Sequence, residues 1–230
     1  MTDTDATESF YNRWARLYDH VATASGVQSW RERAAKTLAL SPGDTVVDLG
    51  CGTGANFPHL QERVGRDGRV VGIDIVPGML AGARERIRRE GWTSVHAVRG
   101  DATRPPVPEV DGLLSTFLVG MLPNPETAVR TWIQCVAPGG RVTLLNAVRS
   151  DRRLAAPLNL AFRGFVRATA PGSRLRRRSP AKTLEARWDA AREALFEGTV
   201  DQIDCRLAGG FVVLASGRVP EHGVASPKRR

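Results

Sequence analysis

Residues 45–55 read Thr45-Val46-Val47-Asp48-Leu49-Gly50-Cys51-Gly52-Thr53-Gly54-Ala55. The first five are β-branched or apolar apart from one acid, which is the composition of a short buried strand. Three glycines at alternate positions follow, and glycine allows a sharp turn and a close approach of ligand to backbone because it has no Cβ. A helical pattern starts after Ala55. We therefore expect a strand, a glycine turn and a helix N-terminus to meet here, the junction that binds nucleotide-like ligands in doubly wound sheets.

The glycine motif fits more than one class of protein. Gly50-x-Gly52-x-x-Ala55, with Asp74 about 20 residues further on, matches the dinucleotide-binding fingerprint. The same residues match the acidic-x-Gly-x-Gly-x-Gly loop of enzymes that use S-adenosylmethionine (SAM). Asp48 favours the second interpretation, because a carboxylate attracts the ammonium group of an amino acid and repels a pyrophosphate. A tight turn with no ligand is the remaining alternative.

Two further acids follow the next predicted strands. Asp74 ends the strand predicted at 69–75, where it could accept hydrogen bonds from ribose hydroxyls. Asp101 follows the strand predicted at 94–98, where it could accept the exocyclic amine of adenine. Either carboxylate would also suit a turn or a helix cap. Met79, in the first turn of the next helix, is predicted either near the adenine or in the core.

Together these segments resemble the class I SAM-dependent methyltransferases. The resemblance is carried by Asp48-Leu49-Gly50-Cys51-Gly52-Thr53-Gly54, by Gly72-Ile73-Asp74 and by Arg99-Gly100-Asp101-Ala102. It implies that SAM is the cofactor and that no metal is required. The cofactor-binding residues that it implies are Asp48, Gly50, Cys51, Gly52, Asp74, Ile75, Met79, Asp101, Ala102 and Phe117.

The N-terminal segment resembles a narrower group. Residues 10–19, which read Phe-Tyr-Asn-Arg-Trp-Ala-Arg-Leu-Tyr-Asp, are similar to the entry segment of ubiquinone/menaquinone-biosynthesis methyltransferases and related lipid N-methyltransferases. This implies a helical lid over residues 1–40. Tyr18, Asp19 and His20 are the nearest candidates for a general base, if the acceptor is a phenol or a quinol carbon. Many of these relatives carry histidines where this chain has Gly120-Met121, which weakens the transfer of their mechanism.

Five strands alternate with helices along the chain, and two more strands follow near its end. This order predicts an α/β fold with a doubly wound, Rossmann-like, seven-stranded sheet and helices on both faces. Its last two strands form an antiparallel hairpin. We expect a SAM-binding domain at 41–218, with a basic helical insertion at about 150–198, and a flexible basic tail at 219–230. The predicted strands are 45–49, 69–75, 94–98, 111–117, 142–148, 199–207 and 211–218.

Composition narrows the class of protein further. The 230 residues suit one domain, and no apolar run approaches the length of a membrane span. The polar, acidic start does not resemble a secretory signal, so we expect a cytoplasmic protein. Three separated cysteines without a C-x-x-C pair predict neither a zinc site nor a disulfide framework.

The net charge of +9 lies in one segment. Residues 149–187 hold eleven basic and two acidic residues, which equals the whole excess. An apolar stripe beside arginines suits contact with an anionic membrane, here the inner face. The same arginines suit RNA phosphates, although stacking aromatics are few. An ordinary helix with a solvated basic face is the third alternative.

The functional hypothesis is a SAM-dependent methyltransferase (EC 2.1.1.-) that acts by direct displacement. Its predicted acceptor is a small lipophilic molecule, such as a quinol, a phospholipid amine or an isoprenoid-linked compound. The alternatives are an RNA methyltransferase that uses residues 149–187, an NAD(P)-dependent oxidoreductase and a non-catalytic SAM-binding protein. The sequence indicates no particular oligomeric state.

Overall fold

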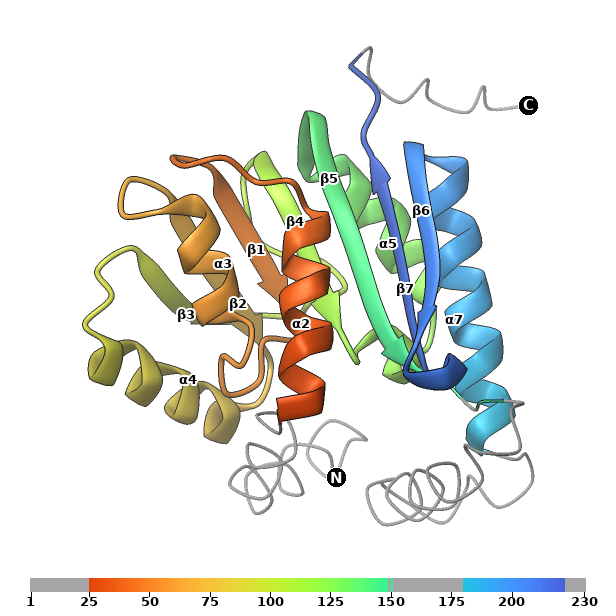
Figure 1. Ribbon diagram of the computed structural model, residues 1–230, viewed down its shortest axis with the longest axis horizontal. Helices are drawn as coiled ribbons and strands as arrows, with labels where there is room; N and C mark the ends of the chain where they lie inside the picture. The colour runs from red at the N-terminus through yellow and green to blue at the C-terminus, as the bar shows by residue number, and fades with distance from the viewer. Residues whose placement is uncertain (1–24, 149, 151–179, 222–230) are drawn as a thin grey trace.

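The computed structural model describes residues 25–148, 150 and 180–221. These residues form a sheet of seven strands in the order β3-β2-β1-β4-β5-β7-β6. Helices α2, α3 and α4 cover one face of the sheet, and α5 and α7 cover the other (Figure 1). The elements are α2 (Ser25–Thr37), β1 (Thr45–Leu49), α3 (Phe57–Val64), β2 (Arg69–Asp74), α4 (Pro77–Glu90), β3 (Val95–Arg99), β4 (Val110–Thr116), η1 (Val119–Met121), α5 (Pro125–Gln134), β5 (Val136–Ala147), α7 (Pro180–Glu197), β6 (Val200–Leu207), η4 (Ala208–Gly210) and β7 (Val212–Arg218).

The strand pairing confirms the predicted fold class. Strand β1 lies between β2 and β4 and is parallel to both, with Leu49 opposite Ile73 on one side and Ser115 on the other. Strand β7 is antiparallel to both β5 and β6. Parallel strands end at the same edge of a sheet, so the glycine loop, Asp74 and the end of β4 are brought to one edge.

Alternation along the buried strands divides the apolar side chains into two cores. Val46 packs with α2, α3 and α4, whereas Val47 packs with α5 and α7. The second core contains Trp132, which is fully buried. Because side chains on a strand point to opposite faces in turn, Asp48 belongs to the same face as Val46. That face carries α2 and α3.

The prediction for the fifth strand was wrong at its start. The sequence pattern predicts it at 142–148, but β5 begins at Val136, two residues after the end of α5 at Gln134. Val136 pairs with Val110, and the ladder resumes with Arg141 opposite Gly112 after an irregularity. The Pro-Gly-Gly turn between them has a left-handed residue, Gly139 at φ +86°. This turn therefore lies within β5, and the β4 residues that pair with the start of β5 are distant in sequence.

Some expectations concern residues outside the described part. These are the N-terminal lid segment up to residue 24, most of the basic insertion and the end of the tail. Among residues 25–148, 150 and 180–221, none of the helices has both the length and the apolar character of a membrane span.

Candidate functional site: a glycine loop at the carboxyl edge of the sheet

The glycine loop folds back over the end of β2. Gly50, Gly52 and Gly54 have φ values of +70°, +55° and +77°, a region that side chains with a Cβ rarely adopt. The backbone N–H groups of Gly50 and Cys51 both donate to the carbonyl oxygen of Ile73, at 2.8 and 3.1 Å. The alternate glycines therefore allow a turn that is held against the neighbouring strand.

Asp74 closes this turn from the end of β2. One carboxylate oxygen accepts the Gly52 N–H at 2.9 Å, and the other accepts the Val76 N–H at 2.9 Å. Burial raises the pKa of Asp74, and these backbone donors oppose the rise. The backbone N–H of Ile75 also acts on this carboxylate, and the acceptor positions that remain are available to a ligand hydroxyl. Beside Asp74, the apolar Ile75 is 39% exposed.

Gly72 allows α3 to pack close to β2. A Cβ at this position would lie 2.4 Å from the Phe57 ring and 2.9 Å from the Cys51 sulfur. Phe57 is fully buried and Cys51 nearly so, and burial is the largest of the effects that raise the pKa of the Cys51 thiol well above its ordinary value. Cys51 is thus a packed residue of the loop and is mostly in the thiol form.

Asp48 lies beneath the loop and is completely buried. The Asn56 side-chain amide donates to its Oδ1 at 2.9 Å, and its Oδ2 has no hydrogen-bond partner in the described part of the chain. The pKa of Asp48 is raised to about 7 as the net result of four effects. Burial raises it most, the Asn56 hydrogen bond and the Arg31 charge lower it, and the Asp74 charge raises it. A buried carboxylate oxygen without a donor is costly, so this site would be completed by a cationic or N–H-bearing ligand.

The polar residues around Asp48 were not predicted from the sequence. Arg31 of α2 donates from Nη1 to the Asn56 Oδ1 at 2.8 Å and to the Thr116 hydroxyl at 2.7 Å. All three of these side chains are at most 5% exposed. One signal was available for Arg31, because its spacing from Ala34 and Ala35 places it on the buried face of α2. Its partners had no such signal, since neither is near it in sequence.

The loop after β3 holds the third predicted acid. Asp101 is exposed, and its Oδ1 accepts both the backbone N–H and the hydroxyl of Thr103, at 2.8 and 2.9 Å. Asp101 therefore does cap a turn. The carbonyl of Ala102 accepts the Trp132 indole N–H at 2.7 Å, which ties this loop to α5.

The other predicted residues lie in different surroundings. Met79 is 3% exposed, so it packs in the interior at the start of α4. Phe117 follows β4 with φ +59°, and its ring lies 5.1 Å from the Arg31 guanidinium carbon. The general-base candidates Tyr18, Asp19 and His20 lie outside the described residues.

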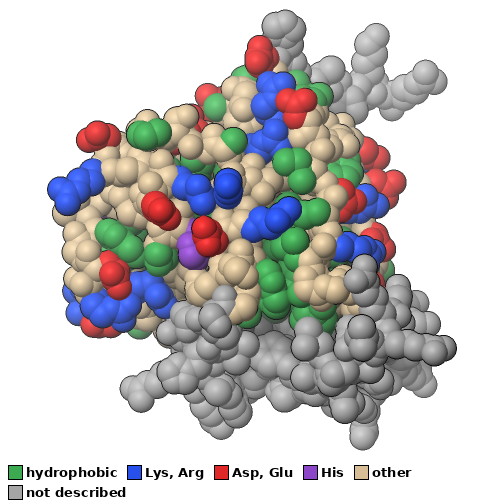
Figure 2. All heavy atoms as spheres, viewed as in Figure 1, with side chains coloured by type: hydrophobic (Ala, Val, Ile, Leu, Met, Phe, Trp, Pro, Cys, Tyr) green, Lys and Arg blue, Asp and Glu red, His purple; other side chains and the backbone are tan. Residues whose placement is uncertain are grey.

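Apolar side chains gather on the face of the sheet next to α2. Figure 2 shows hydrophobic side chains that continue over the region of β5, β7 and β6, with basic side chains between them. Among the partly buried apolar residues that pack against this core are Trp30, Phe117, Cys205, Leu207 and Phe211. Phe117, at the end of β4, is therefore one of the apolar side chains that this core brings near the described site.

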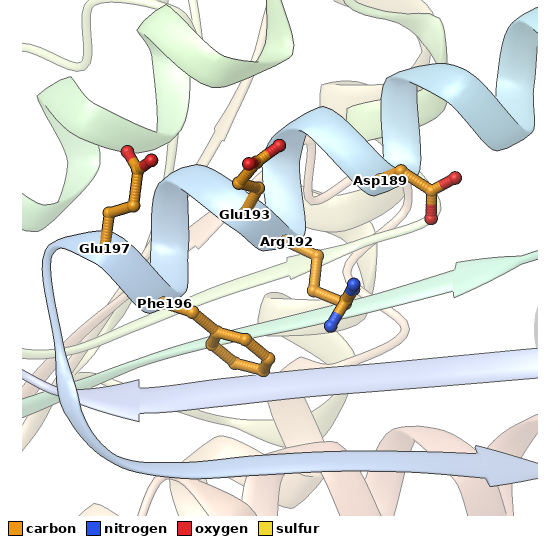
Figure 3. Close-up of a pocket in the computed structure, with 5 residues that line it drawn as sticks. All are labelled: Asp189, Arg192, Glu193, Phe196 and Glu197. Atoms are coloured by element: carbon orange, nitrogen blue, oxygen red, sulfur yellow. The ribbon is translucent and has the colours of Figure 1, made fainter.

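A separate hollow of about 440 Å³ lies on α7. Figure 3 shows that its lining side chains all come from this helix: Asp189, Arg192, Glu193, Phe196 and Glu197. The helix leads from here into β6. The first residue of β6, Val200, pairs with Arg218 of β7, and Arg218 pairs on its other side with Arg141 of β5. The hollow therefore lies toward the edge opposite the glycine loop. Arg192 forms an ion pair with Asp204, and its guanidinium lies over the Phe196 ring. These contacts indicate that the hollow is part of the solvated surface.

Comparison with known proteins supports the same class. A family model described as a methyltransferase domain matches residues 46–140. The 2-phytyl-1,4-naphtoquinone methyltransferase of Synechococcus elongatus is 32% identical, over 90% of this chain and 89% of its own length. The phosphatidylethanolamine N-methyltransferase of Cereibacter sphaeroides is 32% identical over 71% of this chain and 78% of its own. The structure of a SAM-dependent methyltransferase from Aquifex aeolicus superposes with a TM-score of 0.59 at 20% identity, covering 82% of this chain and 89% of the other.

The chain therefore belongs to the class I SAM-dependent methyltransferases, and its cofactor is SAM. The described residues fit this cofactor, because the buried Oδ2 of Asp48 requires a donor and the amino-acid end of SAM carries an ammonium group. The oxidoreductase alternative, which the dinucleotide fingerprint left open, is thereby set aside.

Proposed function

We propose that the protein transfers the methyl group of SAM to a small lipophilic acceptor, with a quinol ring or a phospholipid amine as the two leading classes. The observation that carries this proposal is the 32% identity, over about nine-tenths of both chains, to a methyltransferase named for a naphthoquinone. The match to a phosphatidylethanolamine N-methyltransferase supports the second acceptor class. The partly buried apolar side chains around the core next to α2, Phe117 among them, are compatible with either.

The proposed cofactor contacts follow the geometry of the carboxyl edge. Asp48 and the loop residues Gly50, Cys51 and Gly52 hold the amino-acid end of SAM. This assignment is supported by the unpaired carboxylate oxygen of Asp48. It is also supported by the left-handed glycines, which let a ligand lie against the backbone.

The nucleoside end is assigned to the next two strand ends. Asp74 accepts the ribose hydroxyls with the lone pairs that its backbone bonds leave, and Ile75 offers an apolar surface beside it. Asp101 and Ala102 contact the adenine, with Met79 packed beneath. The Asp101 Oδ2 remains for the exocyclic amine, since Oδ1 is used by Thr103.

SAM, when bound, supplies an activated methyl group on a positively charged sulfur. The protein then has to align the acceptor, exclude water and, for some acceptors, remove a proton. A neutral amine needs no base during attack, whereas a phenol or quinol carbon benefits from one. Tyr18, Asp19 and His20 remain the candidates for that base, and Phe117 is proposed to cover the reacting end.

The first test is calorimetric titration with SAM and S-adenosylhomocysteine (SAH), followed by incubation of the enzyme with labelled SAM and cell extracts. Label that partitions into the organic phase, in a quinone or phospholipid fraction, is the expected result. Label only in nucleic acid would contradict the lipophilic acceptor and favour the RNA methyltransferase. Binding with no transfer to any fraction would favour a non-catalytic SAM-binding protein.

The basic segment 149–187 is proposed to bring a cytoplasmic enzyme to anionic membranes, where a lipophilic acceptor resides. Neutralising the three arginines at 176–178 with glutamine is expected to reduce co-sedimentation with vesicles that contain anionic lipid, since each charge near such a surface contributes about 1 kcal/mol. Arg66, Arg88 and Arg89 are exposed on the described part of the chain, and their triple glutamine variant is the matched control. Equal binding by both variants would contradict membrane contact through this segment.

A further inference from the structure

Arg31 is a buried arginine that belongs to no predicted site. It lies in α2 and is 4% exposed, although arginine is rarely buried unless it is paired. Its Nη1 donates to the Asn56 Oδ1 at 2.8 Å and to the Thr116 hydroxyl at 2.7 Å. These partners come from the start of α3 and the end of β4, so one guanidinium joins three elements.

The contacts continue from Arg31 to the acid below the glycine loop. The Asn56 carboxamide that accepts from Arg31 donates through Nδ2 to the Asp48 Oδ1 at 2.9 Å and to the Thr116 hydroxyl at 3.0 Å. The carboxamide therefore stands between a buried cation and a buried carboxylate. Hydrogen bonds in such a chain polarise one another in a low-dielectric interior, which favours the ionised form of the acid.

The same guanidinium also contacts the turn after β4. Its carbon lies 5.1 Å from the centre of the Phe117 ring, within the range of a cation–π interaction. Phe117 has a left-handed backbone at φ +59°, which an L side chain rarely adopts and which needs support from its surroundings. Arg31 provides part of that support from outside the loop.

We propose that Arg31 is a positioning residue of the SAM site, which keeps Asp48 ionised and oriented through Asn56 and holds the Phe117 turn in place. The inference rests on the proposed contact between Asp48 and the amino-acid end of the cofactor. It assigns to α2 a direct part in cofactor binding, in addition to its packing on the sheet.

Electrostatics supports the direction of the effect. Burial is the main reason why the pKa of Asp48 is raised to about 7, and the Asn56 hydrogen bond and the Arg31 charge keep it from rising further against the added effect of Asp74. Burial, followed by the charges of Asp48 and Asp74, raises the pKa of the neighbouring Cys51 thiol well above its ordinary value. Removing the Arg31 charge would raise the pKa of Asp48 further. At neutral pH the acid would then be protonated and unable to accept from an ammonium group as a carboxylate does.

The test is the pH dependence of SAH affinity, measured by calorimetry from about pH 6 to about pH 8.5. In the wild type, affinity is expected to fall as the pH drops through the pKa of Asp48, near 7. In Arg31→Met this fall is expected at higher pH, with an affinity loss at neutral pH of about tenfold for each unit that the pKa moves. Arg33→Met is the matched control, because Arg33 is exposed on the same helix, and its curve should follow the wild type.

Two further variants separate charge from packing. Arg31→Gln keeps a side-chain donor without the charge and should show the same displacement, whereas Arg31→Lys keeps the charge and should stay near the wild-type curve. This pair decides the matter if Arg31→Met does not fold. In the Asp48→Asn background, the pH-dependent part of the Arg31→Gln effect should disappear.

The possible failures are distinguishable. An affinity loss of the same size at every pH in Arg31→Met and Arg31→Gln would show that Arg31 only supports the fold, and would overturn the inference. Wild-type affinity in Arg31→Gln at neutral pH would also overturn it. Absence of SAH binding by the folded wild type would instead refute the proposed cofactor site itself.

Discussion

Replacing Asp48 by asparagine should stabilise the protein while it weakens cofactor binding. Asp48 is completely buried, and its pKa is raised from an ordinary value of 3.8 to about 7. Between these two pH values the folded protein retains a proton that the unfolded chain has lost. The free energy of unfolding therefore decreases as the pH rises through this window. Above it, the wild type carries a buried, partly unsatisfied charge.

The size of the effect follows from the pKa difference. Each unit corresponds to about 1.4 kcal/mol, so the charged carboxylate destabilises the fold by about 4 kcal/mol above neutrality. Asparagine has the shape of the protonated acid, and its Oδ1 can still accept from Asn56. We expect Asp48→Asn to gain about 1–2 kcal/mol at about pH 5 and about 4 kcal/mol at about pH 8.

Urea denaturation followed by tryptophan fluorescence measures this gain, provided that the m-value is unchanged. Asp67→Asn is the control, because Asp67 is an exposed acid in a turn. A gain for Asp48→Asn that does not grow with pH, or no gain at all, would refute the reasoning. A simultaneous loss of SAM affinity would show that the site is kept at a cost in stability, as expected of functional residues.

Three further predictions concern the loop and its neighbours. Asp74→Ala should weaken SAM binding by about 10- to 100-fold in calorimetry, since charge-assisted hydrogen bonds contribute about 1.5–3 kcal/mol. Asp111→Ala, which removes a similar backbone contact near the opposite edge of the sheet, should bind SAM normally. Equal losses of affinity in the two variants would contradict the assignment of Asp74. Gly72→Ala should lower the free energy of unfolding by about 1–3 kcal/mol through overpacking against Phe57. Adding Phe57→Leu should recover part of this loss in a double-mutant cycle. Absence of coupling between the two substitutions would contradict the contact. Burial and the raised pKa of the Cys51 thiol predict slow alkylation in the folded protein and fast alkylation in the denatured protein, as measured by mass spectrometry. Rapid alkylation of the folded protein would show that the loop opens.

Much of the fold could be predicted from local sequence signals. Strand β1 was predicted with its observed bounds, because a β-branched apolar run ends abruptly at a glycine turn. The acids at 74 and 101 were predicted at strand ends, because each follows a short β-branched or apolar run. Parallel pairing then brings those ends to one edge of the sheet. The start of β5 was predicted wrongly, because the Pro-Gly-Gly turn is a strong local signal while the Val110–Val136 pairing is a distant one.

What the sequence by itself determined is the order of strands and helices, the glycine loop and the class of cofactor, since each depends on residues that are neighbours along the chain. Only the tertiary structure decided which side chains complete the site. Arg31 meets Asn56 from 25 positions away and Thr116 from 85 positions away. Helical periodicity places Arg31 on the same face of α2 as the buried Ala34 and Ala35, but it does not show which polar side chains it meets there. The raised pKa of Asp48 likewise depends on burial beneath a loop and two helices. Such properties arise from packing of distant segments, so they become visible only when the chain is folded.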